Sequence, residues 1–299
     1  MAGVGARDIK RRIKSVNSTK QITKAMELVS TAKLKRRRNA LEATQPYYQA
    51  TMEVVHHIAE NEKSIDHHYL AARPVQQTLY IVIAADRGLC GGYNANALKC
   101  ALNDIVHPEQ TKIVAIGKKS IDFFKRQQFD LVDTISGISE NPQHKDAKRI
   151  AQLVLDMYLQ KEVDQIKLVY TKMKSTILQV ADIITLLPLT VEDSETDESV
   201  KEANGNIFEE EIVPELLNYS PNPEAFINFL IPKYIESTLY GGLLESAASE
   251  QAARRMAMEN ATDNAEEMIE ELTLYFNQAR QAAITQEISE IVGGANAFD

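Results

Sequence analysis

The stretch that decides the fold is residues 243–292, LLESAASEQAARRMAMENATDNAEEMIEELTLYFNQARQAAITQEISEIV. It contains neither proline nor glycine, and apolar or small residues return every three or four positions. This pattern predicts a single helix, on the order of 75 Å long at ~1.5 Å per residue. An ordinary globular core does not need so long a helix, so another element must cover its flank.

The start of the chain predicts a second long helix. Residues 8–45 also lack proline and glycine. Pro46 is expected either to kink this helix or to start a new one, and because the helical pattern resumes after it, the first element is expected to reach residue 60. Its apolar positions form a narrow stripe, which is typical of a coiled-coil seam. The stripe consists of Ile9, Ile13, Val16, Thr19, Ile22 or Thr23, Met26, and Val29 or Ser30.

The C-terminal helix carries a stripe of its own, with a period of about 3.5 residues that predicts a left-handed supercoil with a partner helix. Two partners fit this pattern, the N-terminal helix of the same chain or the same helix of a second copy. The stripe consists of Leu244, Ala248, Gln251, Arg255, Met258, Thr262, Ala265, Ile269, Leu272, Phe276, Ala279 and Ala283.

Between the two helices the pattern alternates between strand and helix, which predicts parallel βαβ units. An acidic stretch at 192–206 reads as an exposed loop, and Pro214, Pro221, Pro223 and Pro232 then interrupt the approach to the C-terminal helix. Strands are expected at 78–85, 112–116, 131–135, 165–171 and 177–187, and helices at 95–106, 118–127 and 145–161.

Composition limits the class of protein. The 299 residues, 44% of them hydrophobic, suffice for about two domains. The longest apolar runs are far shorter than the ~18 residues of a membrane-spanning helix. The N-terminus shows neither a signal peptide nor a presequence. Cys90 and Cys100 are too few for a disulfide framework and are expected to be buried free thiols.

Charge is distributed unevenly within the net charge of −9. Residues 7–38 contain twelve lysines and arginines but only two acids, Asp8 and Glu27, whereas residues 192–215 contain ten acids and one lysine. A basic helix on an acidic protein indicates a polyanionic or acidic protein partner, and the alternative is an ordinary solvated face.

The segment Asp86 to Asn94, DRGLCGGYN, follows the first predicted strand, where a phosphate-binding loop would lie. It matches neither G-x-G-x-x-G nor a P-loop, so we expect a tight turn with Asn94 as a helix cap. The histidine pairs at 56–57 and 67–68 have no companion ligands for a metal. No nucleophile with a placed histidine is found, so no catalytic residue, metal or cofactor is predicted.

The C-terminal helix also carries more hydrogen-bonding side chains than a two-stranded coil requires. Arginine suits carboxylates, so these residues fit an enclosing partner lined with acidic groups, and plain solvent exposure is the alternative. They are Arg254, Arg255, Asn260, Asn264, Asn277, Arg280, Gln281, Thr285, Gln286 and Glu290.

Three segments together resemble the gamma, or central rotor, subunits of F-type ATP synthases. They are IKRRIKSVNSTKQITKAMELVSTAKLKR (9–36), DRGLCGGYN (86–94) and ASEQAARRMAMENATDNAEEMIEELTLYFNQARQAAITQEISEIVGGA (248–295). The resemblance implies an antiparallel coiled coil of the terminal helices with a Rossmann-like three-layer α/β domain between them. The expected domains are residues 1–60, 61–210 (the foot) and 211–299.

The resemblance further implies a non-catalytic shaft, present in one copy and rotating inside a ring of three alpha and three beta subunits. A proton-driven c-ring would turn it, and its unequal faces would bias nucleotide binding by each beta subunit. The foot would lie beside epsilon and the c-ring, on the cytoplasmic side of a bacterial cell membrane. The dithiol insertion of chloroplast members is missing, and the lack of a presequence favours a bacterial protein.

Residue roles follow from the same resemblance. Met26 matches the position that faces the acidic C-terminal lever of the beta subunit, Arg254 matches a partner of that lever, and Cys90 lies in a turn that approaches it.

Near the C-terminus, Arg280 and Gln281 match a pair that hydrogen-bonds a beta loop, and Thr285 and Glu290 match positions tied to coupling. The tip ending in Ala297 and Phe298 would occupy an apolar bearing.

Two rival functions stay open at this point. A basic coiled-coil nucleic-acid-binding protein would use residues 7–38 on phosphates. A nucleotide-dependent enzyme would need a phosphate loop in the middle domain, and the turn at 86–94 lacks the residues for one.

Overall fold

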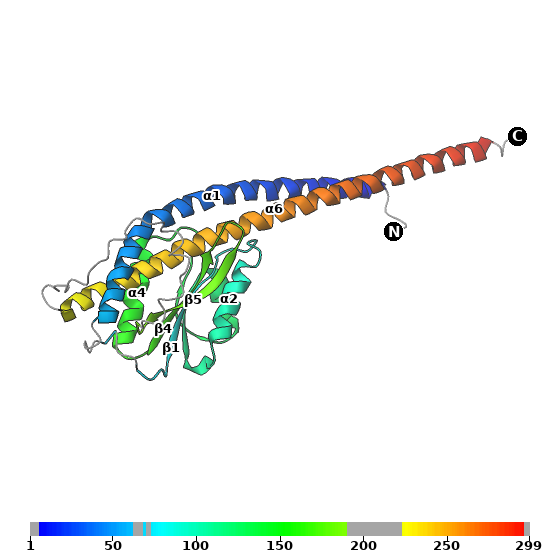
Figure 1. Cartoon of the computed structure of the whole chain (residues 1–299). Coiled ribbons are helices and arrows are strands. Elements are labelled where there is room, and N and C mark those ends of the chain that lie inside the picture. Colours follow the sequence, from blue (N-terminus) through cyan, green and yellow to red (C-terminus); the bar gives the residue numbers. More distant parts are fainter. Residues whose placement is uncertain (1–5, 62–67, 70–72, 190–222, 296–299) are drawn as a thin grey trace. The chain divides into compact units, whose positions relative to one another are not determined.

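A computed structural model describes residues 6–61, 68–69, 73–189 and 223–295. The chain divides into two compact units (Figure 1). The helical unit comprises Met1–Ala32 and Arg254–Asp299, and the α/β unit comprises Lys33–Ala253. The predicted acidic loop at 192–206, Pro214, Pro221 and the tip at Ala297 and Phe298 lie outside the described residues.

The α/β unit contains a five-stranded sheet in the order β3-β2-β1-β4-β5. The first four of these strands are parallel, whereas β5 is antiparallel to β4, because the short connection between them allows a hairpin and no crossover. All five strands lie where the sequence predicted strands, although the reversed direction of β5 was not predicted. Their bounds are β1 Thr78–Ile83, β2 Thr111–Ile116, β3 Asp130–Ile135, β4 Gln165–Met173 and β5 Gln179–Leu187.

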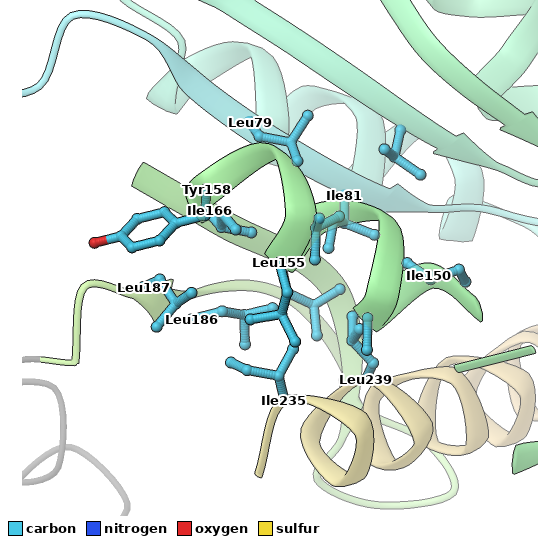
Figure 2. Packing of buried hydrophobic residues seen from close by; sticks show 14 of the residues in the cluster. Leu79, Ile81, Ile150, Leu155, Tyr158, Ile166, Leu186, Leu187, Ile235 and Leu239 are labelled. Carbon is cyan, nitrogen blue, oxygen red and sulfur yellow. The ribbon is translucent and has the colours of Figure 1, made fainter. Parts of the chain in front are cut away.

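Helices cover both faces of the sheet, which makes the predicted three layers. Alternation along β1 sends Leu79, Ile81 and Ile83 into one core and Tyr80 and Val82 into the other. The Tyr80 face is covered by α2 (Tyr93–Asp104) and α3 (Lys118–Arg126). The Leu79 face is covered by α4 (His144–Leu159) and by the first part of α6 (Pro223–Ala295), as Figure 2 shows. A short 3-10 helix, η1 (Pro108–Gln110), precedes β2.

Helix α6 begins at Pro223, well before the predicted start near residue 243. Pro223 occupies the first helical position, where the missing N–H of proline costs nothing, and Pro232 lies inside the helix. The prediction that these prolines interrupt the chain was wrong, because burial of an apolar face on the sheet outweighs their helix-breaking tendency. This face consists of Ile227, Ile231, Ile235, Leu239 and Leu243.

Contact between α6 and β4 depends on small and polar side chains. A Cβ atom added to Gly242 would lie 2.9 Å from Leu168 Cδ2, so a larger residue there would force the Leu168 side chain to shift. The pairing of β4 with β1 ends at Val169. Beyond it, Thr171 N donates to Ser246 Oγ at 3.2 Å, and Ser249 Oγ donates to the Thr171 carbonyl at 2.9 Å. Side chains of α6 therefore replace the strand partner that β4 loses.

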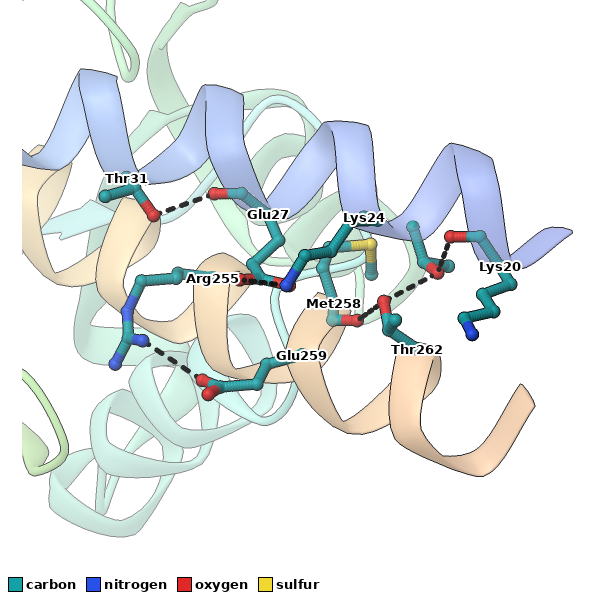
Figure 3. Close-up of polar contacts among 9 residues, drawn as sticks. Lys20, Lys24, Glu27, Thr31, Arg255, Met258, Glu259 and Thr262 are labelled. Carbon is teal, nitrogen blue, oxygen red and sulfur yellow. Dashed lines mark hydrogen bonds and ion pairs between the residues drawn. The ribbon is translucent and has the colours of Figure 1, made fainter. Parts of the chain in front are cut away.

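Helix α1 (Ala6–Asn61) runs through Pro46 to the end predicted for it. Within the helical unit, Lys20 Nζ lies 2.7 Å from Glu266 Oε1. Thr262 Oγ1 lies 2.8 Å from Thr23 Oγ1, and Figure 3 shows the contacts of Thr262. Later residues of α1 therefore meet earlier residues of α6, and the pair is antiparallel. The partner of the C-terminal stripe is the N-terminal helix of the same chain.

The seam of α1 differs in part from the predicted stripe. Thr19, Ile22 and Val29 are exposed, whereas Thr23 and Ser30 are buried. The inward positions continue the alternating spacing of four and three residues that begins with Ile9, Ile13 and Val16. This spacing brings polar residues into the seam, although apolar residues lie next to them in the sequence. The inward residues that follow Val16 are Lys20, Thr23, Glu27 and Ser30.

The seam of α6 agrees with the prediction as far as Ala279, whereas Ala283 is exposed. Ala6 lies as many residues before Lys20 as Arg280 lies after Glu266. The described part of α1 begins at Ala6, which is level with Arg280, and Ala283 lies beyond this described part of the pair.

Candidate coupling surface

The face of α1 beside the seam is apolar and open. Ile22 and Val29 are 61% and 55% exposed, and Met26 between them is half-buried. Their spacing of four and three puts all three on one face of the helix. Met26, the candidate contact residue, thus belongs to an apolar face together with Ile22 and Val29. The sequence had predicted Ile22 and Val29 as possible seam positions.

The C-terminal segment of α6 is exposed on every side. Residues 281–292 are all exposed, and so are the candidate coupling residues Arg280, Gln281, Thr285 and Glu290. Thr285 Oγ1 donates to the Gln281 carbonyl at 3.0 Å. Glu290 Oε1 accepts a hydrogen bond of 2.7 Å from Gln286.

An apolar row that sequence reasoning missed runs along the same segment. Ile284, Ile288 and Ile291 are 49%, 55% and 71% exposed, and their spacing of four and three places them on one face. The helical periodicity of the sequence continues through these three isoleucines and could have predicted the row. The resemblance pointed instead to the polar residues of the same segment.

Arg254 and Arg255 differ in accessibility. Arg254 is buried, with 6% of its surface exposed. Arg255 is half-buried and pairs with Glu259 one turn along the helix, at 3.0 Å. The predicted contact residue Arg254 therefore offers little of its side chain to an outside partner.

The turn that follows β1 does not present Cys90. This cysteine is 1% exposed and packs with Ala85 and Tyr93, while Leu89 is 65% exposed. Burial raises the pKa of the Tyr93 phenol far above its usual range, and the nearby Glu250 raises it further. Any partner of this turn meets residues around Cys90 and not its thiol. Cys100 is half-buried, so only Cys90 is as buried as predicted.

Asn94 is not the cap of α2, contrary to the prediction. The helix begins at Tyr93, two residues earlier than predicted, with Gly92 as the N-cap, and the Asn94 side chain points back to the turn. Its Oδ1 accepts a hydrogen bond of 2.9 Å from Ala85 N. This bond connects the first turn of α2 to the backbone that follows β1.

The carboxylate of Asp86 lies at the N-terminus of α3, the helix that follows β2. Its Oδ1 accepts a hydrogen bond of 3.1 Å from Lys118 N at the start of α3, so a carboxylate of the chain itself lies at that helix N-terminus. The neighbouring Gly117 has a φ of +88°, and an added Cβ would lie 2.0 Å from the Ala84 carbonyl oxygen. These contacts serve packing of the loops.

The remaining ionic contacts of the α/β unit are structural. Asp104 Oδ2 accepts hydrogen bonds of 2.6 Å from Lys167 Nζ and 2.7 Å from the Tyr80 hydroxyl. Partial burial opposes ionisation of Asp104, but these bonds outweigh it and lower its pKa. Among the residues that the structure describes, no three His, Cys, Asp or Glu side chains gather as a metal site would require. None of the described helices has an apolar stretch long enough to cross a bilayer.

The fold and the exposed surfaces define a protein whose two long terminal helices pair with each other and whose three-layer α/β domain is inserted between them in the sequence. A family model described as ATP synthase matches residues 5–298. The chain is 51% identical over 297 residues to the ATP synthase gamma chain of Alkaliphilus metalliredigens, with 99% of each chain covered. It is 44% identical to the gamma chain of Acetobacterium woodii, named as sodium ion specific, with 98% of each covered. The chain belongs to the ATP synthase gamma-chain family.

Solved structures agree with this fold. A chain of the Euglena gracilis mitochondrial ATP synthase, in a structure of OSCP, F1 and c-ring, matches with a TM-score of 0.66 and 21% identity, over 98% of this chain and 94% of that one. A chain from the central stalk and c-ring of the Tetrahymena thermophila mitochondrial enzyme matches with a TM-score of 0.57 and 25% identity, over 80% and 99%.

Proposed function

We propose that this chain is the central rotor shaft of an F-type ATP synthase and that it transmits torque without catalysing a reaction itself. The observation that carries the proposal is the end of α6, where residues 281–292 are exposed on all sides. A helix that leaves isoleucines exposed on one face and polar groups on the others suits a sleeve that surrounds it.

Burial in such a sleeve would supply the binding energy. Each of Ile284, Ile288 and Ile291 would contribute about 1.5–3 kcal/mol when fully buried. The polar side chains Arg280 and Gln281 would hydrogen-bond the wall. We propose a ring of three alpha and three beta subunits as the sleeve, with one copy of this chain inside it.

Torque transmission requires unequal contacts with the ring. A shaft shifts a beta subunit between nucleotide-binding states only by binding those states with different free energies. The apolar face of Ile22, Met26 and Val29 lies on one side of α1, so a rotating shaft would present it to one subunit at a time. We assign Met26, Arg254, the turn around Cys90, and Thr285 and Glu290 to this coupling surface.

The α/β domain is proposed to lie beside epsilon and the c-ring, which would attach the chain peripherally to the cytoplasmic side of a cell membrane. Since one relative is named as sodium ion specific, ion translocation has to be measured with both Na⁺ and H⁺.

The nucleic-acid-binding alternative is not favoured. Several basic residues of α1 already pair with acids, among them Arg11 with Asp8 at 3.0 Å and Lys20 with Glu266 at 2.7 Å. The relatives described above are subunits of ATP synthases, and none is named for binding nucleic acid.

The test is reconstitution of the full chain with the alpha, beta, epsilon and c subunits in vesicles. We expect one copy per complex, no ATP turnover by the chain alone, and ion pumping driven by ATP. Met26→Lys should leave assembly intact but lower the number of ions pumped per ATP. Val106→Lys adds the same charge at a 77% exposed valine of the α/β unit and serves as the control. Turnover by the isolated chain, or unchanged pumping in Met26→Lys, contradicts the proposal.

A further inference from the structure

Helix α6 changes the way it contacts the sheet after Leu243. Its apolar face packs on the sheet as far as this residue, but residues 245–252, ESAASEQA, are all small or polar. Residues 246–252 are nonetheless buried, each with at most 1% of its surface exposed. Burial of polar side chains costs free energy unless they are hydrogen-bonded, so apolar burial alone does not account for this segment.

Three side chains of the segment bind the backbone of β4 beyond the end of its pairing with β1. Ser246 Oγ accepts a hydrogen bond of 3.2 Å from Thr171 N, and Ser249 Oγ donates one of 2.9 Å to the Thr171 carbonyl oxygen. Glu245 Oε1 accepts a hydrogen bond of 3.1 Å from Met173 N. These contacts lie on one edge of β4, and the other edge is paired with β5. We call Glu245, Ser246 and Ser249, together with the backbone of Thr171 and Met173, the joint.

Helix α1 also contacts this part of α6. Its Leu34 is 7% exposed and belongs to a buried cluster with Ala248 and Ala252 of α6, against which Met173 of β4 packs. All four residues belong to the α/β unit. Both terminal helices and β4 therefore meet at the joint.

Apolar contacts and hydrogen bonds resist motion differently. Burial of apolar surface is non-directional, so it keeps a helix close to the sheet but offers little resistance when the helix rolls about its own axis. Hydrogen bonds weaken steeply when donor and acceptor lose their alignment. The three bonds of the joint leave residues 245–249 of α6 and end on one strand, so a roll of α6 would break them together. The joint thus fixes the angle of α6 about its own axis relative to β4.

We propose that Glu245, Ser246 and Ser249 are positioning residues through which torque passes between the α/β domain and the paired terminal helices. This inference rests on the proposed rotor function, in which the c-ring turns the α/β domain. Since α6 is one helix from Pro223 to Ala295, an angle imposed on it at the joint is passed along the helix. The apolar face before the joint holds α6 on the sheet, and the joint prevents it from rolling there.

The experiment measures angular stiffness in the complex of the full chain with the alpha, beta and epsilon subunits. The ring of alpha and beta subunits is fixed on glass, and a bead is attached to the α/β domain through Val106→Cys, at a 77% exposed position, with the native Cys90 and Cys100 replaced. A non-hydrolysable ATP analogue holds the paired helices in the ring, so the variance of the bead angle reports how firmly the domain is joined to them. With ATP, the same bead reports rotation.

Ser249→Ala removes one of three bonds that act in parallel. The variance of the bead angle should rise by roughly 1.5-fold, and by up to about threefold when Ser246→Ala is added, because typical hydrogen bonds contribute similar amounts.

Ser120→Ala is the matched control. Ser120 has no exposed surface, and its Oγ donates to the Val82 carbonyl oxygen at 3.3 Å, so it also bonds a helix to a strand, but it joins α3 to β1. This variant should lower the thermal unfolding temperature about as much as Ser249→Ala and leave the variance unchanged. Equal variance in Ser120→Ala and Ser249→Ala would overturn the proposal.

Glu245 tests the joint at a half-buried position, where a substitution does not disturb the core. Glu245→Gln keeps an oxygen that can accept the bond from Met173 N, so the variance should stay close to that of the unaltered joint. Glu245→Ala removes the acceptor and should raise the variance as Ser249→Ala does. The same variance in both Glu245 variants would show that this bond carries no torque.

The rotation measurement separates the two proposals. If ATP does not turn the bead on a chain with an unaltered joint, the rotor function itself fails. If the bead turns but the joint variants have the same variance as Ser120→Ala, the inference about the joint fails alone.

Discussion

The α/β unit and the helical unit use their apolar residues in opposite ways. In the sheet, Leu79, Ile81 and Leu168 have no exposed surface. In the helical unit, Thr23 and Thr262 meet in the seam, while Ile22 and Ile291 are 61% and 71% exposed. The first unit contains a large buried apolar core, whereas among the described apolar residues of the second unit only Met258 and Ala265 are buried. This difference indicates that the paired helices complete their packing against other proteins.

The largest expected effect comes from truncating the same residue type in each unit. Ile81→Ala leaves a cavity in a fully buried core and should lower the free energy of unfolding by about 2–5 kcal/mol. Ile22→Ala removes an exposed side chain and should change it by no more than about 0.5 kcal/mol. Chemical denaturation of the isolated chain measures both.

In the reconstituted complex, Ile22→Ala should have a larger effect than in the isolated chain, because a partner would then cover Ile22. We expect Ile22→Ala to weaken coupling there while leaving the isolated chain stable. Equal destabilisation of the isolated chain by both variants would show that the contrast between the units is false.

A smaller effect is expected from the ion pairs of the two units. Asp104→Asn breaks two hydrogen bonds in the half-buried cluster with Lys167 and Tyr80, and should cost about 1–2 kcal/mol near neutral pH. The hydrogen bond from Lys20 also lowers the pKa of Glu266, but this pair lies on the surface, so Glu266→Gln should cost less.

The pH dependence follows from the lowered pKa of Asp104. Its contribution to stability is fully present above the unfolded pKa of about 3.9 and is lost as the pH falls through the lower folded value. Denaturation curves between neutral and acidic pH should therefore converge for wild type and Asp104→Asn at the acidic end. Parallel curves would contradict the role given to Asp104.

The smallest effect on stability is expected at the seam. Thr23 and Thr262 each have a carbonyl of their own helix within reach, Lys20 O at 3.0 Å and Met258 O at 2.8 Å, so the pair is fully hydrogen-bonded in either direction. Thr23→Val should cost less than about 1 kcal/mol, and Thr23→Val with Thr262→Val should be close to neutral. A double-mutant cycle from denaturation curves measures the coupling.

The same pair should determine the register of the coil. A slip of α1 along α6 by seven residues would put Thr23 opposite Arg255 in one direction or Ile269 in the other. In the direction that brings Thr23 to Arg255, Lys20 would still lie opposite an acid, Glu259, so the ion pair alone does not exclude this slip. With the native cysteines replaced, a disulfide between cysteines at positions 20 and 266 reports the native register, and one between 20 and 259 reports the slip. We expect the slipped disulfide only in the double valine variant, and its absence there would show that other residues fix the register.

Prediction from sequence succeeded where a local pattern was sufficient. The five strands, the three shorter helices and the end of α1 near residue 60 follow from periodicity and breaker residues. It failed where two patterns competed. Ile22 and Val29 look like seam residues by hydrophobicity, but the helical period selects Thr23 and Ser30. Asn94 looks like a cap by residue type, yet the helix begins two residues earlier than predicted, with Gly92 as the cap.

The candidate contacts divide in the same way. Polar residues such as Arg280 and Gln281 could be named from the sequence motif, and the structure places them on an exposed helix. The burial of Arg254 and Cys90, and the exposure of Leu89, could not be inferred, because each depends on neighbours that are distant in sequence. Whether these residues act in coupling stays a prediction.

The sequence by itself determined the two long helices, the alternating middle domain and the family, because periodicity, missing breakers and extended motifs are local properties of the chain. Only the tertiary structure decided that α6 begins at Pro223 as a layer of the sheet domain, and which face of α1 forms the seam. The physical reason is that burial depends on what packs opposite. In α6, the free energy gained by burying an apolar face outweighed the helix-breaking tendency of Pro232. In α1, the geometry of the helix pair placed the polar residues Thr23 and Ser30 in the seam and left Ile22 exposed.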